Sequence, residues 1–372
     1  MECSISNIID MHDTWLSIDS IQGCTNGCKY CFLQGKGDNL SQPKIVASAS
    51  ETISYLLSSK YYDSRIPLCL LPGTDAFLNE KNAHYMKELL EILASKNVSN
   101  PIIIITKCLI PDYILDYLDE LTKKGFKIVV YLSFSGLGKK YEPNIDYENI
   151  KLNFYNLASR GIRIIHYYRP FLQENSSAKN IKEMLDFVNQ YTSVSVITGL
   201  KLRSDFIDKI DFLPLAKTNP EACINASSIW PHEAYDFFFK DYQHSQNVFQ
   251  TNYCALAQTL EEPCPQYFGT FECKNYNHCS PEQRKRCRTF QKNQPQNVDQ
   301  LLFDLIKRLG KYNSEIELVR EDNNIIVKNS KLTIPDAAYL TRILGYKISI
   351  EKRQEDDIHF NSSITNSKPL IF

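Results

Sequence analysis

The sequence predicts an α/β fold: a parallel sheet closed into a partial barrel of about six β-α units. Between residues 14 and 202, short apolar runs alternate with stretches of helical periodicity. The apolar runs are continuous, which is typical of parallel strands buried on both faces, and the connections between them are short. The chain has 372 residues, 43% of them hydrophobic, and can therefore bury a core of this size.

The expected strands are six apolar runs. They cover residues 14–21, 66–72, 101–107, 127–135, 162–170 and 193–200. The expected helices lie between these runs, near residues 45–60, 79–95, 111–124, 146–160 and 177–191. Two of the helical stretches are followed by Gly125 and Gly161, and glycine adopts at low cost the left-handed conformation that ends many helices. With connections this short, the alternation predicts a single barrel or partial barrel of about six units.

The alternation stops after Leu202. Residues 216–295 are rich in Cys, Pro and aromatic residues and show little periodicity. Beyond them the pattern predicts a helix, a hairpin turning at Asp322–Asn324, a helix from Pro335 to Gly345 and a final strand. We therefore expect three parts: a partial barrel over 1–215, a Cys-rich metal-binding segment over 216–295, and a small α+β domain over 296–372.

Composition argues against several classes of protein. The net charge of −1 gives no overall field that would attract nucleic acid or a membrane. No apolar run approaches the roughly 18 residues that a membrane-spanning helix needs. The first residues lack the basic and apolar regions of a secretory signal. We expect a cytoplasmic protein.

The chain has 12 cysteines, and most of them fall into two groups. Because the cytosol keeps thiols reduced, clustered cysteines there indicate metal binding and not disulfides. The groups are Cys24, Cys28 and Cys31, and then Cys254, Cys264, Cys273, Cys279 and Cys287.

The first group has the spacing Cys-x3-Cys-x2-Cys. A closed zinc site and a ferredoxin-type cluster each take four ligands. Three thiolates on a [4Fe–4S] cluster leave one iron open to a substrate or cofactor. The alternative is a structural zinc with a distant fourth ligand.

The stretch CTNGCKYCF, residues 24–32, resembles the cluster loop of radical S-adenosylmethionine (SAM) enzymes. The resemblance implies a partial (β/α)6 radical SAM barrel in which Cys24, Cys28 and Cys31 hold a [4Fe–4S] cluster. It also implies that SAM binds the open iron, with Phe32 near the adenine. Reductive cleavage of SAM then gives a 5′-deoxyadenosyl radical that abstracts hydrogen from a substrate. A reductant such as flavodoxin or ferredoxin is the implied partner.

Further segments resemble spore photoproduct lyase and its relatives, in the same order, over roughly residues 20 to 190. They are CKYCFLQ, PGTDAFLNE, PIIIITK, YLSFSG…KKYEP and RGIRIIHYYRPF. In this group a Ser/Thr-Asp pair replaces the turn that holds the SAM amine, which implies that role for Thr74 and Asp75. The alternative for Asp75 is a capped turn.

Other polar residues end neighbouring expected strands: Lys107, Ser133 and Arg169. The carboxyl ends of parallel strands meet at one edge, so these residues and Asp75 are expected to share a pocket. Lys107 is a candidate for the SAM carboxylate or ribose, or else a solvated lysine.

One departure concerns the substrate. Spore photoproduct lyase has a hydrogen-donating cysteine near this turn, whereas here Pro72 precedes the turn and Cys69 lies inside the strand. We therefore expect a substrate other than thymine dimers, with nucleic acid or nucleotide as the favoured class. One alternative is a radical SAM maturase of a peptide or protein. The other is a non-catalytic nucleic-acid-binding protein in which an Fe–S cluster or zinc only stabilises the fold.

For the second group, Cys254, Cys273, Cys279 and Cys287 are the predicted ligands of a second [4Fe–4S] cluster, with zinc as the alternative. Cys264 lies between prolines and is expected in a packed turn, and His278 is a substitute ligand. The segment is also basic, with aromatic residues interleaved, which favours either a nucleic-acid contact or a solvated helix. The basic residues are Lys274, Arg284, Lys285, Arg286, Arg288 and Lys292.

Overall fold

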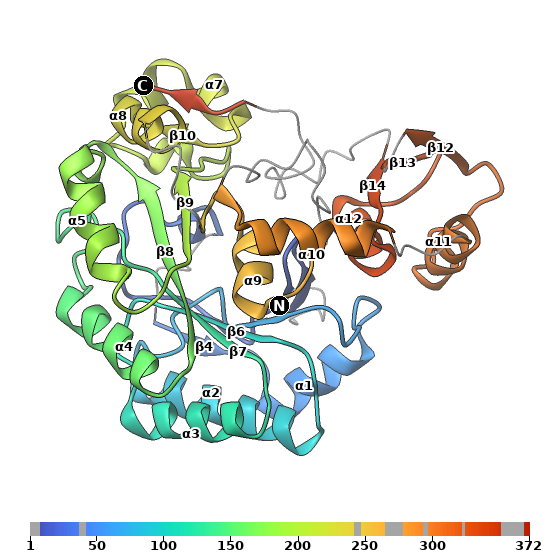
Figure 1. Cartoon of the computed structure of the whole chain (residues 1–372), viewed down its shortest axis with the longest axis horizontal. Coiled ribbons are helices and arrows are strands. Elements are labelled where there is room, and N and C mark those ends of the chain that lie inside the picture. Colours follow the sequence, from blue (N-terminus) through green and yellow to red (C-terminus); the bar gives the residue numbers. More distant parts are fainter. Residues whose placement is uncertain are drawn as a thin grey trace.

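A computed structural model describes residues 8–36, 42–241, 247–264, 278–292, 297–321, 324–350 and 368–372. Its centre is an eight-stranded sheet in the order β1-β2-β5-β6-β7-β8-β9-β11 (Figure 1). Only β1 (Ile9–Met11) runs antiparallel to its neighbour in this sheet, and the other pairings are parallel. The prediction of an α/β fold with a mostly parallel sheet is confirmed.

The predicted elements up to residue 200 are present, with bounds close to the expected ones. The strands are β2 (Leu16–Ile18), β5 (Leu68–Leu70), β6 (Ile102–Thr106), β7 (Ile128–Leu132), β8 (Arg163–Phe171) and β9 (Ser195–Gly199). The helices are α1 (Ala49–Ser58), α2 (Glu80–Ser95), α3 (Asp112–Lys123), α4 (Tyr147–Ser159) and α5 (Ala178–Val188). Side-chain caps at Ser48, Asn79, Asp146 and Ser177 begin four of these helices.

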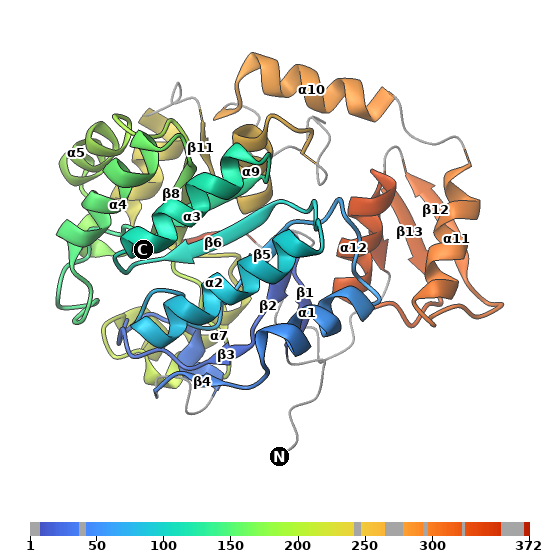
Figure 2. The same ribbon diagram turned by 90° about the horizontal axis from the view of Figure 1, so that it is seen from below.

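Successive residues of the central strands point to opposite faces of the sheet, as the two-residue period of a strand requires. Leu68 and Leu70 pack in the cluster that contains the apolar faces of α1 to α4, which form the outer layer (Figure 2). Cys69 and Tyr131 belong to a separate cluster on the inner face, together with α9 (Asn252–Leu260). The concave side of the sheet is therefore filled by a helix from the Cys-rich segment.

The sheet also contains a strand that the sequence did not predict. β11 (Val248–Phe249) pairs in parallel with β9, beyond the point where the alternation was expected to stop. A strand of two residues is too short to produce a periodic signal. The elements before it are η4 (Ile207–Lys209), α6 (Pro214–Thr218), α7 (Pro220–Asn225), β10 (Ile229–Trp230), α8 (His232–Asp236) and the π-helix Phe237–Asp241.

Two small sheets complete the region around the barrel. β3 (Ile21–Gln22) pairs antiparallel with β4 (Lys44–Ile45), and the first cysteine group and η2 (Phe32–Lys36) lie between them in the chain. β15 (Leu370–Ile371) pairs in parallel with β10, although the last dozen residues showed no periodicity. Long-range pairing, and not local pattern, forms this strand.

The C-terminal elements are α10 (Pro281–Lys292), α11 (Val298–Arg308), β12 (Glu317–Glu321), β13 (Asn324–Lys328), α12 (Ile334–Leu344) and β14 (Lys347–Ile350). β12 and β13 form the predicted hairpin, and β14 pairs with β13. A capping box at Thr333 starts α12, and Gly345 ends it with φ 72°. Tyr61 ties α12 to the barrel, since its hydroxyl donates to Asp336 Oδ1 at 2.7 Å. The proposed boundaries after residues 215 and 295 stay predictions.

Candidate functional site

The first cysteine group lies at the carboxyl edge of the sheet. Cys24, Cys28 and Cys31 are all free of disulfides. The hydroxyl of Thr74, just beyond β5, donates to the carbonyl of Gly23 at 2.5 Å and fixes the start of the loop. In parallel barrels this edge is the one that carries active sites.

The thiols are shielded from water, and two cations lie nearby. Burial is the main reason that the pKa of Cys24 and the pKa of Cys28 are each raised to about 12, and it also raises the pKa of Cys31. Lys107 opposes this effect at Cys28, and Lys107 and Arg169 oppose it at Cys31. A metal must displace the thiol protons to bind, and these cations favour the resulting thiolates.

The three thiols on this loop could serve as ligands of an iron–sulfur cluster. Across the described residues, no three Cys, His, Asp or Glu side chains form a group that could hold one metal ion. In a [4Fe–4S] cluster each thiolate binds a different iron, so the sulfurs stand further apart than the ligands of one ion. Three thiols on one short loop would bind three of the irons and leave the fourth without a ligand from the loop.

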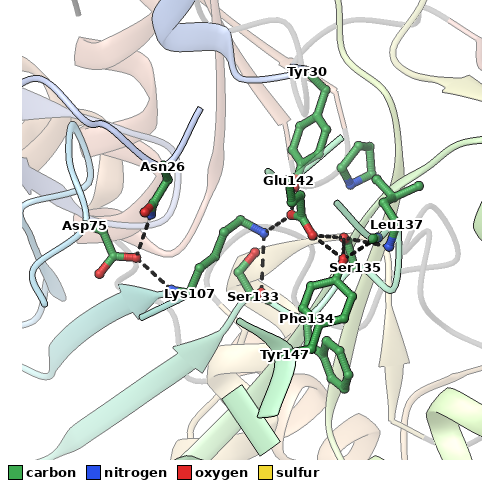
Figure 3. A network of polar contacts seen from close by, with 12 residues as sticks. Asn26, Tyr30, Asp75, Lys107, Ser133, Phe134, Ser135, Leu137, Glu142 and Tyr147 are labelled. Carbon is green, nitrogen blue, oxygen red and sulfur yellow. Dashed lines mark hydrogen bonds and ion pairs between the residues drawn. The ribbon is translucent and has the colours of Figure 1, made fainter. Parts of the chain in front are cut away.

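Asp75 is buried and accepts four hydrogen bonds, and Figure 3 shows the two from Asn26 and Lys107. Oδ1 accepts from the Thr106 hydroxyl at 2.7 Å and from the amide of Phe77 at 3.1 Å. Oδ2 accepts from the amide of Lys107 at 2.7 Å and from Asn26 Nδ2 at 3.5 Å. A carboxylate has about four acceptor positions, so Asp75 is fully occupied in joining β5, β6 and the cysteine loop.

Lys107 connects Asp75 to a second buried carboxylate, Glu142 (Figure 3). Its ammonium lies 2.6 Å from Glu142 Oε1 and 3.3 Å from the carbonyl oxygen of Ser133. Burial lowers and Glu142 raises the pKa of Lys107, and the net effect is a rise. Lys107 is therefore not a solvated lysine, which was the alternative prediction.

Glu142 was seen in the sequence only as part of a loop, and no role was predicted for it. It is fully buried and accepts from Tyr30, Lys107, Ser135 and Tyr147. Burial raises its pKa, but Lys107 and these hydroxyl groups lower it more, so the carboxylate stays charged. The available signal was the resemblance of the segment KKYEP, in which Glu142 is the only acidic residue.

The remaining predicted residues lie around the same edge. Ser133 is buried and contributes its carbonyl oxygen to Lys107. Arg169 Nη1 donates to the hydroxyl of Tyr167 at 2.7 Å, and its charge acts on Cys31. Phe32 is 41% exposed.

The second cysteine group lies at the opposite edge and on the inner face. Cys254, Cys264 and Cys287 are buried in the cluster with α9, and Cys279 packs against it. The sulfurs of Cys254 and Cys264 are 3.5 Å apart, and the Cys264 amide donates to Cys287 Sγ at 3.3 Å. Cys273 lies outside the described residues.

Two contacts place this group at the amino edge. Lys127, just before β7, forms an ion pair of 2.5 Å with Glu262. Arg342 of α12 interacts electrostatically with Cys264 and Glu262, and it donates to the carbonyl of Thr14, just before β2, at 3.1 Å. The structure also places Cys264, which was not among the predicted ligands, beside the predicted ligand Cys254.

The sequence matches no protein-family model and no curated protein. Its structure is similar to spore photoproduct lyase in complex with a dinucleoside spore photoproduct, with a TM-score of 0.42 and 13% identity, over 55% of this chain and 61% of that one. It is also similar to a radical SAM methyltransferase from Sphaerobacter thermophilus, with a TM-score of 0.39 and 16% identity over 53% of this chain and 59% of that one. A third similar structure is Streptococcus suis SuiB bound to S-adenosylmethionine. Its TM-score is 0.45 and its sequence identity is 16%, over 70% of this chain and 56% of that one. This chain thus spans about three fifths of the length of the lyase.

Spore photoproduct lyase is also the group that the cysteine-loop segments resemble. No helix in the described ranges is long and apolar enough to cross a membrane.

Proposed function

We propose that this chain is a radical SAM enzyme whose [4Fe–4S] cluster is held by Cys24, Cys28 and Cys31. The observation that supports the proposal most is the placement of three unpaired thiols on one loop at the carboxyl edge, beside a buried lysine. When bound there, a cluster with one open iron supplies an electron for the cleavage of SAM into methionine and a 5′-deoxyadenosyl radical, which then takes hydrogen from the substrate.

The residues around the loop have different roles in this proposal. Lys107 uses two of the three donor positions of an ammonium on acceptors in the described residues, so one is left for the SAM carboxylate or ribose. Asp75 reaches the SAM amine only by giving up one of its four donors, and its main role is to hold the loop. Phe32 contributes an exposed ring for the adenine.

The proposed substrate class is nucleic acid or nucleotide, on the sequence resemblance alone. The basic residues of the second segment do not add to it, because α10 carries Cys287 and Arg286 to the amino edge. Arg286 pairs with Glu261 at 3.4 Å, close to Cys264. Peptide or protein maturation and a non-catalytic nucleic-acid-binding role are the alternatives that the experiment below separates.

We also propose that the second cysteine group binds a metal with a structural role. Two thiolates on one tetrahedral zinc, with Zn–S bonds of about 2.3 Å, stand about 3.8 Å apart. The 3.5 Å between the sulfurs of Cys254 and Cys264 is close to this value and favours a shared ion over separate irons of a [4Fe–4S] cluster. The remaining ligands in this proposal come from the predicted set of Cys273, Cys279 and Cys287. Cys273 is needed because the described residues by themselves form no group of three ligands for one ion.

The activity is tested with anaerobically reconstituted protein, a reductant such as dithionite or flavodoxin, and SAM. Formation of 5′-deoxyadenosine, measured by mass spectrometry, supports the radical SAM proposal, and its absence from protein that carries about four irons contradicts it. Faster formation with oligonucleotides or nucleotides than with peptides supports the substrate class. Cleavage that only peptides accelerate favours maturation.

A further inference from the structure

The loop of residues 141–144 lies along the cysteine loop and contacts it at four points. The amide of Lys29 donates to the carbonyl of Tyr141 at 3.0 Å, and Asn144 Nδ2 donates to the carbonyl of Thr25 at 2.8 Å. Between these backbone contacts, the hydroxyl of Tyr30 donates to Glu142.

The fourth contact is steric. Gly27 has φ of +69°, and a Cβ atom there would stand 3.2 Å from Pro143 Cγ. A side chain at residue 27 would therefore be crowded by Pro143, and the positive φ also favours glycine there. Every position from Tyr141 to Asn144 has a partner between Thr25 and Tyr30, so the second loop follows the course of the first.

Glu142 is the charged centre of this contact. Its Oε1 accepts from Tyr30, which stands between Cys28 and Cys31 in the sequence, and from Lys107 at 2.6 Å. Its Oε2 accepts from Ser135 at 2.6 Å and from Tyr147, on the side away from the cysteine loop. One oxygen thus faces the proposed cluster loop and the other faces the barrel.

We propose that Glu142 is a positioning residue that holds the Cys28–Cys31 half of the loop through Tyr30 and balances the charge of Lys107 beside it. This inference rests on the proposed function for its relevance to the cluster. The contacts themselves can be tested in metal-free protein. The carboxylate touches no reacting atom, and acts through Tyr30 and Lys107.

The first experiment measures how fast iodoacetamide alkylates each cysteine of the reduced, metal-free chain. Tyr30→Phe and Tyr147→Phe make the same change on opposite oxygens of Glu142. Tyr30→Phe should speed alkylation of Cys28 and Cys31 roughly tenfold, because one hydrogen bond to a charged group is lost. Tyr147→Phe should leave both rates near those of the wild type. Equal effects of the two variants would overturn the proposal.

Glu142→Gln removes the charge and keeps the size, and Glu148→Gln is its matched control because Glu148 is exposed on α4. Glu142→Gln should speed alkylation of Cys28 and Cys31, while buried Cys69 and Cys223 report whether the whole chain has loosened. Faster alkylation at all four cysteines would contradict a local positioning role.

The second measurement is the reduction potential of the reconstituted cluster. In Glu142→Gln the Lys107 cation is no longer balanced, so the potential should become less negative than in Glu148→Gln. Adding Lys107→Met should bring it back toward the wild type, since both charges are then absent. An unchanged potential in Glu142→Gln would overturn the charge-balancing role. If wild-type protein holds no cluster, the proposed function fails, while the alkylation result still decides on the positioning role.

Discussion

The two cysteine groups lie at opposite edges of one sheet and are held by different kinds of contact. Cys24, Cys28 and Cys31 belong to one short loop, fixed by buried polar groups such as Asp75 and Glu142. The second group gathers cysteines from α9, from the turn after it and from α10, and it sits in an apolar cluster on the inner face. A reactive site needs charge and an open face, whereas a structural site needs only to join separate elements.

The largest expected effect separates the two groups by function. Replacing Cys24, Cys28 and Cys31 together with Ala should abolish SAM cleavage and remove about four irons per chain. The second group should keep its metal, because its thiolates come from other elements. Metal analysis of the purified variant checks this: one zinc and no colour is the expected result. Retained SAM cleavage would contradict the assignment of the reactive group, and loss of both metals would contradict the independence of the two.

Asp75→Ala tests whether the cysteine loop depends on the Asp75 carboxylate, whose four acceptor positions are all occupied. The change leaves the Thr106 hydroxyl and the amides of Phe77 and Lys107 without their acceptor, and each buried orphan costs roughly 1–3 kcal/mol. We expect the free energy of unfolding to fall by about 3 kcal/mol or more in urea denaturation.

Thr74→Val is the control, since it removes a single hydrogen bond of the same loop. If Asp75→Ala cost no more than this control but abolished SAM binding, Asp75 would be a ligand of the SAM amine and not a support.

A neutral histidine behind the reactive edge should make that side sensitive to acid. His166 on β8 is fully buried between Ser195 and the carbonyl of Phe134, and burial lowers its pKa from 6.5 to about 4. Below pH 6.5 the unfolded chain binds a proton that the folded chain excludes. Above pH 6.5 the neutral His166 therefore makes its full contribution to the free energy of unfolding. This contribution is lost as pH falls toward 4, by about 3 kcal/mol in total.

The measurement is the free energy of unfolding of metal-free protein between pH 7 and 4.5. His166→Asn, which keeps a polar side chain without this titration, should flatten the pH dependence. The same slope in both proteins would show that other groups cause it.

The smallest expected effect is the loss of stability when one glutamine at each cysteine group is replaced. Gln283 is buried and donates to the carbonyl of Glu262 at 2.6 Å and to Cys287 Sγ at 3.6 Å. Gln34 is partly exposed and donates to the carbonyls of Cys28 and Lys29. Since water replaces the bonds of an exposed group, Gln283→Ala should cost about 1–2 kcal/mol and Gln34→Ala less than about 1 kcal/mol. Thermal denaturation of both variants decides whether the apolar site is the more sensitive one.

The sequence by itself determined the elements that have a local signal. Six strands, the five helices between them, the glycines that follow two of these helices and the Cys24–Cys31 spacing depend on residues within one element or one loop, so periodicity and spacing were sufficient to find them. The sequence also predicts that residues at the carboxyl ends of the strands lie close together, because parallel strands bring these ends to one edge of the sheet. This is how Asp75, Lys107, Ser133 and Arg169 were placed beside the loop.

Only the tertiary structure decided which distant residues meet. β11 and β15 are two residues long and exist through pairing with strands far away in the chain. Cys264 looked like a packed turn because its neighbours are prolines, yet its sulfur lies beside that of Cys254 on another element. Glu142 carries no periodic signal in its loop, and two of its four donors, Tyr30 and Lys107, come from positions 112 and 35 residues away in the chain. A buried charge is defined by the groups packed around it, and those groups are set by the fold and not by the neighbouring sequence.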